Sequence, residues 1–249
     1  VMGLHSYFQQ KMIPFESVMS KVWNKKIFEN IQKQVDQASV DLAEERGPCP
    51  DAADYGIKER FSNKTAIAPT ASISIICGGT SPGIEPIAAN SYTHKTLSGS
   101  FNVRNKYLSK LLEKYGKNDE ETWSSITTNQ GSVSHLEFLT KEEKDVFKTA
   151  FELDQRWIVD LGADRTPHIS QAQSINIFIP ADIHKRDLHQ IHFQAWKKGL
   201  KSLYYCRSKS IQRAENVNDA KLTDVTANVY KSKQQQGEEP NYEECLSCQ

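Results

Sequence analysis

The chain has 249 residues, enough to bury a substantial core as one large α/β domain or two small ones. Its 31 Lys and Arg residues balance 31 Asp and Glu residues, so no net field favours nucleic acid or a membrane surface. We find no apolar run of about 18 residues and no leader, so a cytoplasmic location is predicted. Five cysteines with one close pair are typical of a reducing compartment rather than of a disulfide scaffold.

The first third of the chain predicts one long helix followed by loops. The sequence opens on apolar residues, which is typical of a chain entered partway through a fold. Apolar residues then recur at helical spacing from Phe15 to Arg46. Gly47-Pro48 ends this pattern, and a loop to Gly56 is expected. An extended stretch is predicted over Ala66 to Ile76, before a glycine-rich loop over Cys77 to Gly83.

The middle of the chain predicts two more helices. Phe101 to Tyr115 has a helical pattern, and Gly116 is placed to end it. Thr140 and Glu143 have the spacing of a capping box, in which each side chain satisfies a free backbone N–H group of the other residue. We expect the helix that they open to run through Trp157 to about Leu161.

The clearest unit is a strand, a helix and a second strand. Gln173 to Ile179 alternates in the manner of a strand, and a helix starts after Pro180 and ends at Gly199. Its inner side is predicted to carry Leu188, Ile191, Ala195 and Trp196. Leu200 to Cys206 is the second strand, so the unit is a parallel βαβ crossover. In total we expect an α/β fold with roughly five or six strands.

The end of the chain differs from the rest. Residues 1–230 are predicted to form the folded domain, and residues 231–249 a flexible polar tail. Cys245 and Cys248 lie in this tail behind a linker of about ten residues, whose reach is on the order of 20 Å. Such a pair is suited to carry electrons to a disulfide elsewhere. The alternatives are half of a zinc site, which would need two further ligands, and two incidental exposed cysteines.

Two further segments are candidates for chemistry, each with an ordinary alternative. A run of small and hydroxyl residues offers hydroxyl and backbone N–H groups to a phosphate: Pro69, Thr70, Ala71, Ser72, Ile73 and Ser74. Such runs are also common in plain strands. Tyr204 and Tyr205 are either a relay of oxidisable phenols or one buried and one exposed ring on a strand.

Other polar residues carry less information. His184, His189 and His192 lie on one predicted helix without a carboxylate to complete a metal site, so we interpret them as solvated residues and predict no metal. Glu85 is an acid in a tight loop, and its spacing does not indicate a function.

Several segments occur together in one order: Ala68–Ser72, Gly83–Pro86, Tyr92–Gly99, Asp154–Trp157, Gln171–Asn176, Lys201–Tyr205 and the terminal cysteine pair. In series they resemble the C-terminal portion of the large, catalytic subunit of class I ribonucleotide reductase, and they cover nearly the whole chain. The resemblance implies the C-terminal half of a ten-stranded α/β barrel with a flexible C-terminal redox tail.

The resemblance also implies roles for the candidate residues. The P-T-A-S loop of the family holds the diphosphate of a ribonucleoside diphosphate, which implicates the segment from Pro69 to Ser74. Adjacent tyrosines carry a radical, so Tyr205 would receive it at the subunit interface and Tyr204 would pass it to a catalytic cysteine. The family stacks these rings, so a bend or strand end is expected at Tyr204. Cys245 and Cys248 would re-reduce the active-site disulfide and accept electrons from thioredoxin or glutaredoxin.

The sequence also departs from the family pattern. The radical-bearing cysteine of the family lies in an N-x-C-x-E loop, and Cys49, Cys77 and Cys206 have the wrong neighbours for that role. We expect Cys77 and Cys206 to be small buried packing residues. The allosteric region and the first half of the barrel are not represented, so either a divided gene, for which phage genomes are a candidate source, or a piece of a longer subunit is predicted.

The chain is therefore predicted to be part of a ribonucleoside-diphosphate reductase that binds no cofactor itself. It would be active only with the N-terminal part of the large subunit and with a metal-containing small subunit that generates the radical. Two rival hypotheses are a non-catalytic phosphate-binding or subunit-docking module, and an independent thiol oxidoreductase.

Overall fold

The computed structural model describes residues 1–96 and 99–208. Helices dominate these residues: α1 (Leu4–Gln10), α2 (Val18–Arg46), α3 (Pro50–Asp54), α4 (Ala71–Ile76), α5 (Lys106–Lys114), α6 (Glu120–Thr128), α7 (Lys141–Val146), α8 (Gln155–Arg165), the short 3-10 helix η1 (Thr166–His168) and α9 (Lys185–Lys197). Strand β1 (Ser91–Thr96) pairs antiparallel with β2 (Gly99–Arg104), from Ser91 opposite Arg104 to Thr96 opposite Gly99. Strand β3 (Ile177–Ile179) pairs parallel with β4 (Cys206–Ser208).

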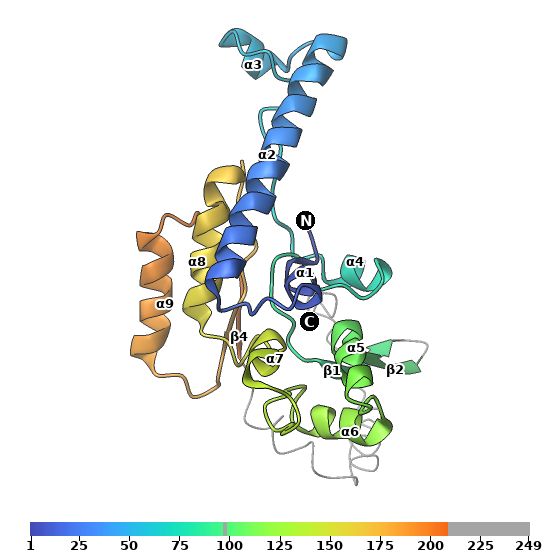
Figure 1. Cartoon of the computed structure of the whole chain (residues 1–249). Helices are drawn as coiled ribbons and strands as arrows, with labels where there is room; N and C mark the ends of the chain where they lie inside the picture. Colours follow the sequence, from blue (N-terminus) through green and yellow to red (C-terminus); the bar gives the residue numbers. More distant parts are fainter. Residues whose placement is uncertain (97–98, 209–249) are drawn as a thin grey trace, which may run out of the picture.

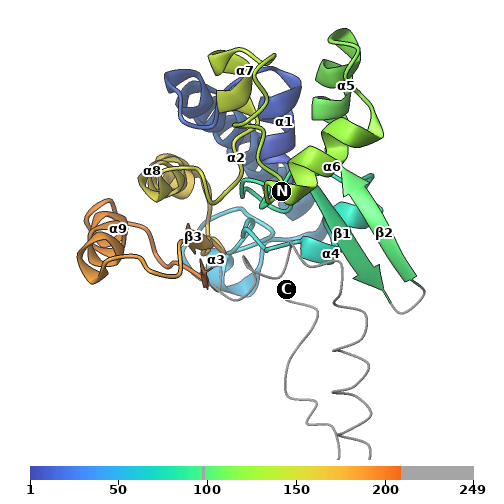
Figure 2. The ribbon, with the colours of Figure 1, turned by 90° about the horizontal axis from the view of Figure 1, so that it is seen from below.

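Helix α8 lies between α2 and α9, while α3 lies at the far end of the long α2 rod (Figure 1). The view from below shows the β1–β2 hairpin on the opposite side of the molecule from α9 (Figure 2). Asp160 on α8 joins the three helices, because its carboxylate oxygens lie 2.9 Å from Lys21 Nζ and 2.5 Å from Lys198 Nζ. In the part of the chain that the structure describes, no helix combines the length and apolar character needed to cross a bilayer.

Two hydrophobic cores hold these elements. The larger one joins α1, α2, α8, α9 and β3 and is centred on fully buried side chains such as Phe8, Phe28 and Ile177. The smaller one joins α5 and α6 to the end of α7 and the segment before it, around Leu108, Trp123 and Phe147. Burying a side chain of this size contributes on the order of 2–3 kcal/mol, so these two clusters fix the framework of the chain.

The predicted long helix is confirmed, but its apolar series is only partly buried: Ile27 and Ile31 pack against the larger core, whereas polar residues take other buried positions. Ser17 caps α2 by accepting from the N–H group of Ser20 at 3.1 Å, and Gly47 ends it with a φ of 79°. Val18, in the apolar series, is 74% exposed, whereas Ser20 and Asn24 are fully buried. Asn24 tolerates burial because its Nδ2 donates to the carbonyl of Leu161 at 2.9 Å, which ties α2 to α8.

Several predicted boundaries were wrong because side-chain caps divide the segments. The capping box of Thr140 and Glu143 is confirmed, but the helix ends at Val146, and Asp154 caps a separate helix, α8. Residues 101–104 belong to β2 rather than to a helix, since Asn105 caps α5 by accepting from Tyr107 N–H at 3.0 Å. The loop predicted after Gly47 contains α3.

The extended interpretation of residues 66–76 was also wrong beyond Pro69. Ile67 forms an isolated parallel bridge with Gln173, but Thr70 turns the chain with a φ of 53° and α4 follows. Trp196, expected on the inner side of α9, is 73% exposed, because α9 packs on one face only, through Ile191 and Ala195.

The parallel crossover from β3 through α9 to β4 is confirmed, but its strand boundaries were wrong. Only the last three residues of the predicted Gln173–Ile179 strand form β3, and β4 begins at Cys206, where the predicted Leu200–Cys206 strand was expected to end. The expected strand count was too high: the residues described here form four strands in two two-stranded sheets and no closed barrel. A barrel closes only when every edge strand finds a neighbour, and these short pairs leave their edges open.

His5 on α1 gives the fold a predicted pH dependence. Its ring is fully buried, and its Nδ1 accepts from the N–H group of Ile87 at 3.0 Å. Burial lowers the pKa of His5 from 6.5 to about 3, so the folded chain keeps this ring neutral while the unfolded chain protonates it. The free energy of unfolding is therefore expected to fall by about 1.4 kcal/mol per pH unit as the pH drops below 6.5.

Urea unfolding of the wild type and of His5→Asn, between pH 7.5 and pH 4.5, measures this effect. Asparagine keeps an acceptor for Ile87 N–H but has no proton to gain, so its stability should lose this component of the pH slope. Equal slopes in the two proteins would contradict the assignment to His5.

Candidate functional site

Tyr204 and Tyr205 lie next to each other immediately before β4. Their ring centroids are 4.1 Å apart with planes tilted by 54°, and the residues are 46% and 47% exposed. The alternative of one buried and one exposed ring is therefore wrong. Regular strand structure begins only at Cys206, which lets both rings lie on the same side of the chain.

The backbone of this tyrosine pair is held by the segment that leads into β3. The N–H group of Tyr204 donates to the carbonyl of Ile175 at 2.8 Å, and the N–H group of Ile177 donates to the carbonyl of Tyr205 at 2.9 Å. A third bond comes from a side chain, since Asn176 Oδ1 accepts from Tyr205 N–H at 3.0 Å. The pair is thus anchored on a segment whose own side chains are buried.

A buried carboxylate lies behind Asn176. Glu85 is 6% exposed, and its two oxygens accept from the backbone N–H and from Nδ2 of Asn176, each at 3.1 Å. Burial raises the pKa of Glu85, while the bonds from Asn176 and the positive charges of Arg207 and Arg165 oppose that shift. The sequence analysis named Glu85 but assigned it no function, because its partner Asn176 lies 91 positions away.

The segment from Pro69 to Ser74 forms the start of α4. Thr70 adopts a left-handed backbone and makes no side-chain cap to the helix; its Oγ1 instead accepts from Gly83 N–H at 2.7 Å. The first N–H groups of α4, from Ala71 to Ile73, have no acceptor within the helix, as at any helix start. Ser74 is buried and its hydroxyl donates to the carbonyl of Ala71 at 2.8 Å, whereas Ser72 is exposed.

Helix α1 holds the loop of Ser81 to Gly83, which contacts the Pro69–Ser74 segment. Ser6 and Ser81 exchange two bonds: Ser6 N–H donates to Ser81 Oγ at 3.1 Å, and Ser81 N–H donates to Ser6 Oγ at 2.8 Å. Gly83 has a φ of 48°, and a Cβ there would lie 3.0 Å from the carbonyl oxygen of Ala68. The loop therefore approaches the Pro69–Ser74 segment closely only because residue 83 is glycine.

The remaining candidate residues of the sequence analysis that the structure describes, three histidines and two cysteines, are exposed. His184, His189 and His192 are exposed on or at the start of α9, as predicted, and the described residues contain no group of three or more potential metal ligands. Cys77 and Cys206 are exposed, so their predicted burial was wrong. Cys245 and Cys248 lie outside the described residues.

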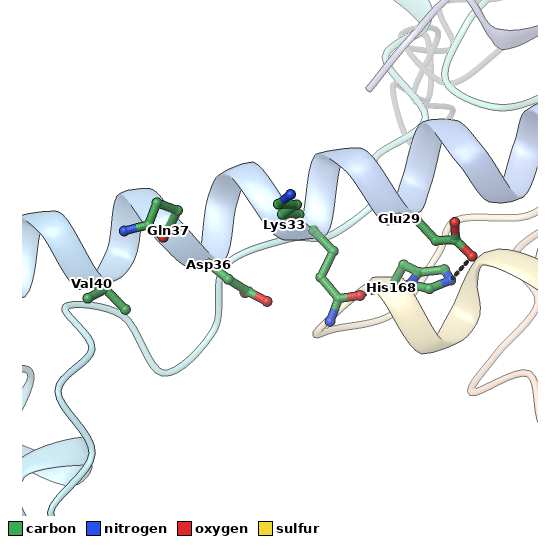
Figure 3. A pocket seen from close by; sticks show the side chains of 7 residues that line it. Glu29, Lys33, Asp36, Gln37, Val40 and His168 are labelled. Atoms are coloured by element: carbon green, nitrogen blue, oxygen red, sulfur yellow. Dashed lines mark hydrogen bonds and ion pairs between the residues drawn. The ribbon is translucent and has the colours of Figure 1, made fainter.

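A shallow hollow lies along α2. It is lined by residues of α2 and by His168 of η1, and by no residue of α4 or of the tyrosine pair. Its lining is mostly charged or polar: Glu29, Gln32, Lys33, Asp36, Gln37, Val40 and His168 (Figure 3). His168 Nδ1 is 2.7 Å from Gln32 Oε1, and its Nε2 is 3.9 Å from Glu29 Oε1. His168 therefore already has partners in Gln32 and Glu29, and none of the predicted site residues lines the hollow.

The structure places the tyrosine pair at the end of a parallel crossover and the Pro69–Ser74 segment at the start of a helix, and comparison with known families identifies the class of protein. The family model described as "Ribonucleotide reductase, barrel domain" matches residues 1–55 and 51–206. The chain belongs to the ribonucleotide reductase large-subunit family and corresponds to part of its barrel domain.

Individual relatives agree with this membership. The ribonucleoside-diphosphate reductase large subunit of Invertebrate iridescent virus 6 is 43% identical over 98% of this chain and 27% of its own length. The large subunit of Danio rerio is 34% identical over 84% of this chain and 30% of its own length. The solved Actinobacillus ureae class Id ribonucleotide reductase alpha subunit superposes with a TM-score of 0.78 at 40% identity, over 86% of this chain and 39% of that one.

The chain thus spans between about a quarter and two fifths of the length of these relatives. The viral relatives include large subunits of Invertebrate iridescent viruses 6 and 3 rather than of phages, so the phage source suggested by the sequence gains no support.

Proposed function

We propose that this chain supplies three working parts of a ribonucleoside-diphosphate reductase: a loop for the substrate diphosphate, a tyrosine pair for radical transfer, and a dithiol tail. The observation that carries the proposal is the 4.1 Å contact between the Tyr204 and Tyr205 rings on an exposed part of a reductase-family chain. The cysteine that abstracts hydrogen belongs to an N-terminal part, since Cys49, Cys77 and Cys206 lack the N-x-C-x-E surroundings.

The two tyrosines would act as consecutive stations for one electron and one proton. A phenol with a pKa near 10 keeps its proton at neutral pH, so electron and proton must leave together to a positioned acceptor. Tyr205 would give both to the small subunit, which supplies the radical. Tyr204 would then restore Tyr205 and take an electron and a proton from the catalytic cysteine. The ring contact supports the middle transfer, and the exposure of both residues suits contacts with other subunits.

The loop would hold the substrate by its phosphates. The N–H groups of Ala71, Ser72 and Ile73 point along the start of α4, where backbone donors and the helix dipole favour an anion. The exposed hydroxyl of Ser72 adds a donor, while Thr70 serves the loop through its bond from Gly83. Pro69 and Ser74 would bound the segment at its two ends and help to fix its conformation.

The tail would return the active site to its reduced state after each turnover. A thiolate of Cys245 or Cys248 attacks the active-site disulfide and forms a mixed disulfide, which the second thiol resolves. The active site regains two thiols and the tail becomes a disulfide. Thioredoxin or glutaredoxin then reduces the tail, which fits a protein of the cytoplasm.

A threonine substitution in the loop tests the substrate role. Thr70→Val should leave Gly83 N–H without its acceptor and loosen the phosphate loop, which costs about 1–1.4 kcal/mol, roughly a five- to tenfold rise in KM for the ribonucleoside diphosphate. The assay uses the chain assembled with the N-terminal part and the small subunit.

Two controls accompany this variant. Thr70→Ser keeps the hydroxyl and should keep a KM close to that of the wild type. Thr93→Val removes an exposed hydroxyl from the hairpin, where it lies 3.1 Å from Asn102 Oδ1, and should leave KM unchanged. A KM for Thr70→Val equal to that of Thr93→Val would count against the loop as the substrate site.

A further inference from the structure

Glu85 is a carboxylate that is almost completely buried. A carboxylate removed from water is strongly destabilising unless hydrogen bonds and positive charge compensate it. Both compensations are present: Asn176 donates twice, at 3.1 Å each, and the guanidinium groups of Arg165 and Arg207 contribute positive charge. An apolar side chain at position 85 would need neither hydrogen bonds nor positive charge to be buried. The presence of a carboxylate there therefore indicates a role beyond packing.

The orientation of the Asn176 amide depends on this carboxylate. An ionised carboxylate only accepts, so the amide must turn its Nδ2 toward Glu85, which leaves Oδ1 facing the N–H group of Tyr205 at 3.0 Å. The opposite orientation would place oxygen against oxygen and an NH₂ group against an N–H group. Glu85 therefore selects the rotamer in which Asn176 accepts from the tyrosine backbone.

The bond from Tyr205 N–H to Asn176 Oδ1 is the side-chain contribution to the anchoring of the tyrosine pair, which otherwise uses backbone groups. Two of the bonds join backbone groups only and do not depend on the side chains. The N–H group of Tyr204 donates to the carbonyl of Ile175, and the N–H group of Ile177 donates to the carbonyl of Tyr205. The bond from Tyr205 N–H to Asn176, with Asn176 1% exposed, is the one that a side chain controls. It acts on the residue that the proposed function places at the subunit interface.

We infer that Glu85 is a positioning residue for radical transfer: through Asn176 it fixes the backbone of Tyr205, and so the place of its ring against Tyr204. This inference rests on the proposed function of the tyrosine pair. It assigns Glu85 no contact with substrate or with the radical. It requires only that displacement of Tyr205 slows electron and proton transfer, which depends steeply on geometry.

The test is a charge exchange between the two partners in the assembled reductase. Glu85→Gln has only one side-chain oxygen for the two donors of Asn176. When that oxygen accepts from the backbone N–H of Asn176, the new NH₂ group faces Asn176 Nδ2, so the Asn176 amide turns and the bond to Tyr205 should be lost. We expect kcat to fall about tenfold or more, with KM changed less than about twofold. Asn176→Asp alone faces a carboxylate with a carboxylate and should be at least as slow.

The double variant Glu85→Gln with Asn176→Asp should recover most of the lost kcat. The amide introduced at position 85 then donates to one oxygen of the carboxylate introduced at position 176, and the other oxygen accepts from Tyr205 N–H. This rescue separates positioning from general damage, because two destabilising changes would otherwise add. A double variant as slow as the slower single one would overturn the inference.

A matched control removes the effect of fold stability. Gln155 on α8 is also 6% exposed and uses Oε1 to accept from Phe178 N–H at 2.7 Å. Phe178 lies on β3, which begins directly after Asn176, but the printed hydrogen bonds of Gln155 do not involve Tyr204 or Tyr205. Gln155→Glu should lower the melting temperature and leave kcat unchanged at temperatures where the chain is folded. If Tyr205→Phe is inactive while Glu85→Gln keeps the wild-type kcat, the inference fails alone. If Tyr205→Phe is active, the proposed function itself fails.

Discussion

Replacement of either Tyr204 or Tyr205 by phenylalanine is expected to reduce turnover of the assembled reductase to the level seen without the small subunit. Phenylalanine keeps the ring, so the contact at 4.1 Å and the local packing should survive. It lacks the O–H group, so it has no proton to release with an electron, and oxidation of the bare ring is far harder. In the proposed relay each phenol is a separate station that every transfer sequence must pass, so loss of either should stop the whole sequence.

Steady-state formation of deoxyribonucleoside diphosphates, measured for each variant with the N-terminal part and the small subunit, checks this prediction. Tyr55→Phe is the matched control, because Tyr55 is 84% exposed next to α3, on a different element from the pair. Its turnover should equal that of the wild type. Retained activity in both Tyr204→Phe and Tyr205→Phe would favour the rival hypothesis of a phosphate-binding or docking module whose tyrosines only pack.

The fold was predictable where a local signal and the tertiary structure agree. The end of α2 at Gly47 and the capping box of Thr140 depend on neighbouring residues, and both are confirmed. The crossover from β3 to β4 was predictable because its alternating strand and amphipathic helix have distinct periods. Residues 101–104 were not, since a strand there depends on pairing with β1, which no local pattern reports.

The candidate site was predictable only in part. The proposed phosphate segment and the proposed tyrosine relay come from the family resemblance and stay predictions, whereas the ring contact agrees with the expected interruption of the strand near Tyr204. The role of Glu85 could not be predicted, because it arises from a contact with Asn176 across 91 positions. The burial of polar residues on α2 was missed for a similar reason: Asn24 is buried only because Leu161 and Arg165 offer partners.

The second large effect expected is a gain of activity on assembly. The chain carries the proposed loop, relay and tail but no cysteine in an N-x-C-x-E setting, so hydrogen abstraction from the ribose requires another polypeptide segment. The isolated chain should therefore form no deoxyribonucleotide, even with the small subunit and thioredoxin present. The thiols of Cys245 and Cys248 alone should support only dithiol exchange.

The most direct measurement is turnover of a ribonucleoside diphosphate before and after addition of an N-terminal part that contains the N-x-C-x-E loop, with the small subunit and thioredoxin or glutaredoxin in both samples. We predict no product without that part and multiple turnovers with it. With Cys245→Ser and Cys248→Ser combined, turnover should stop once the pre-reduced active site is spent. Sustained turnover by the isolated chain, or none by the full mixture, would contradict the account.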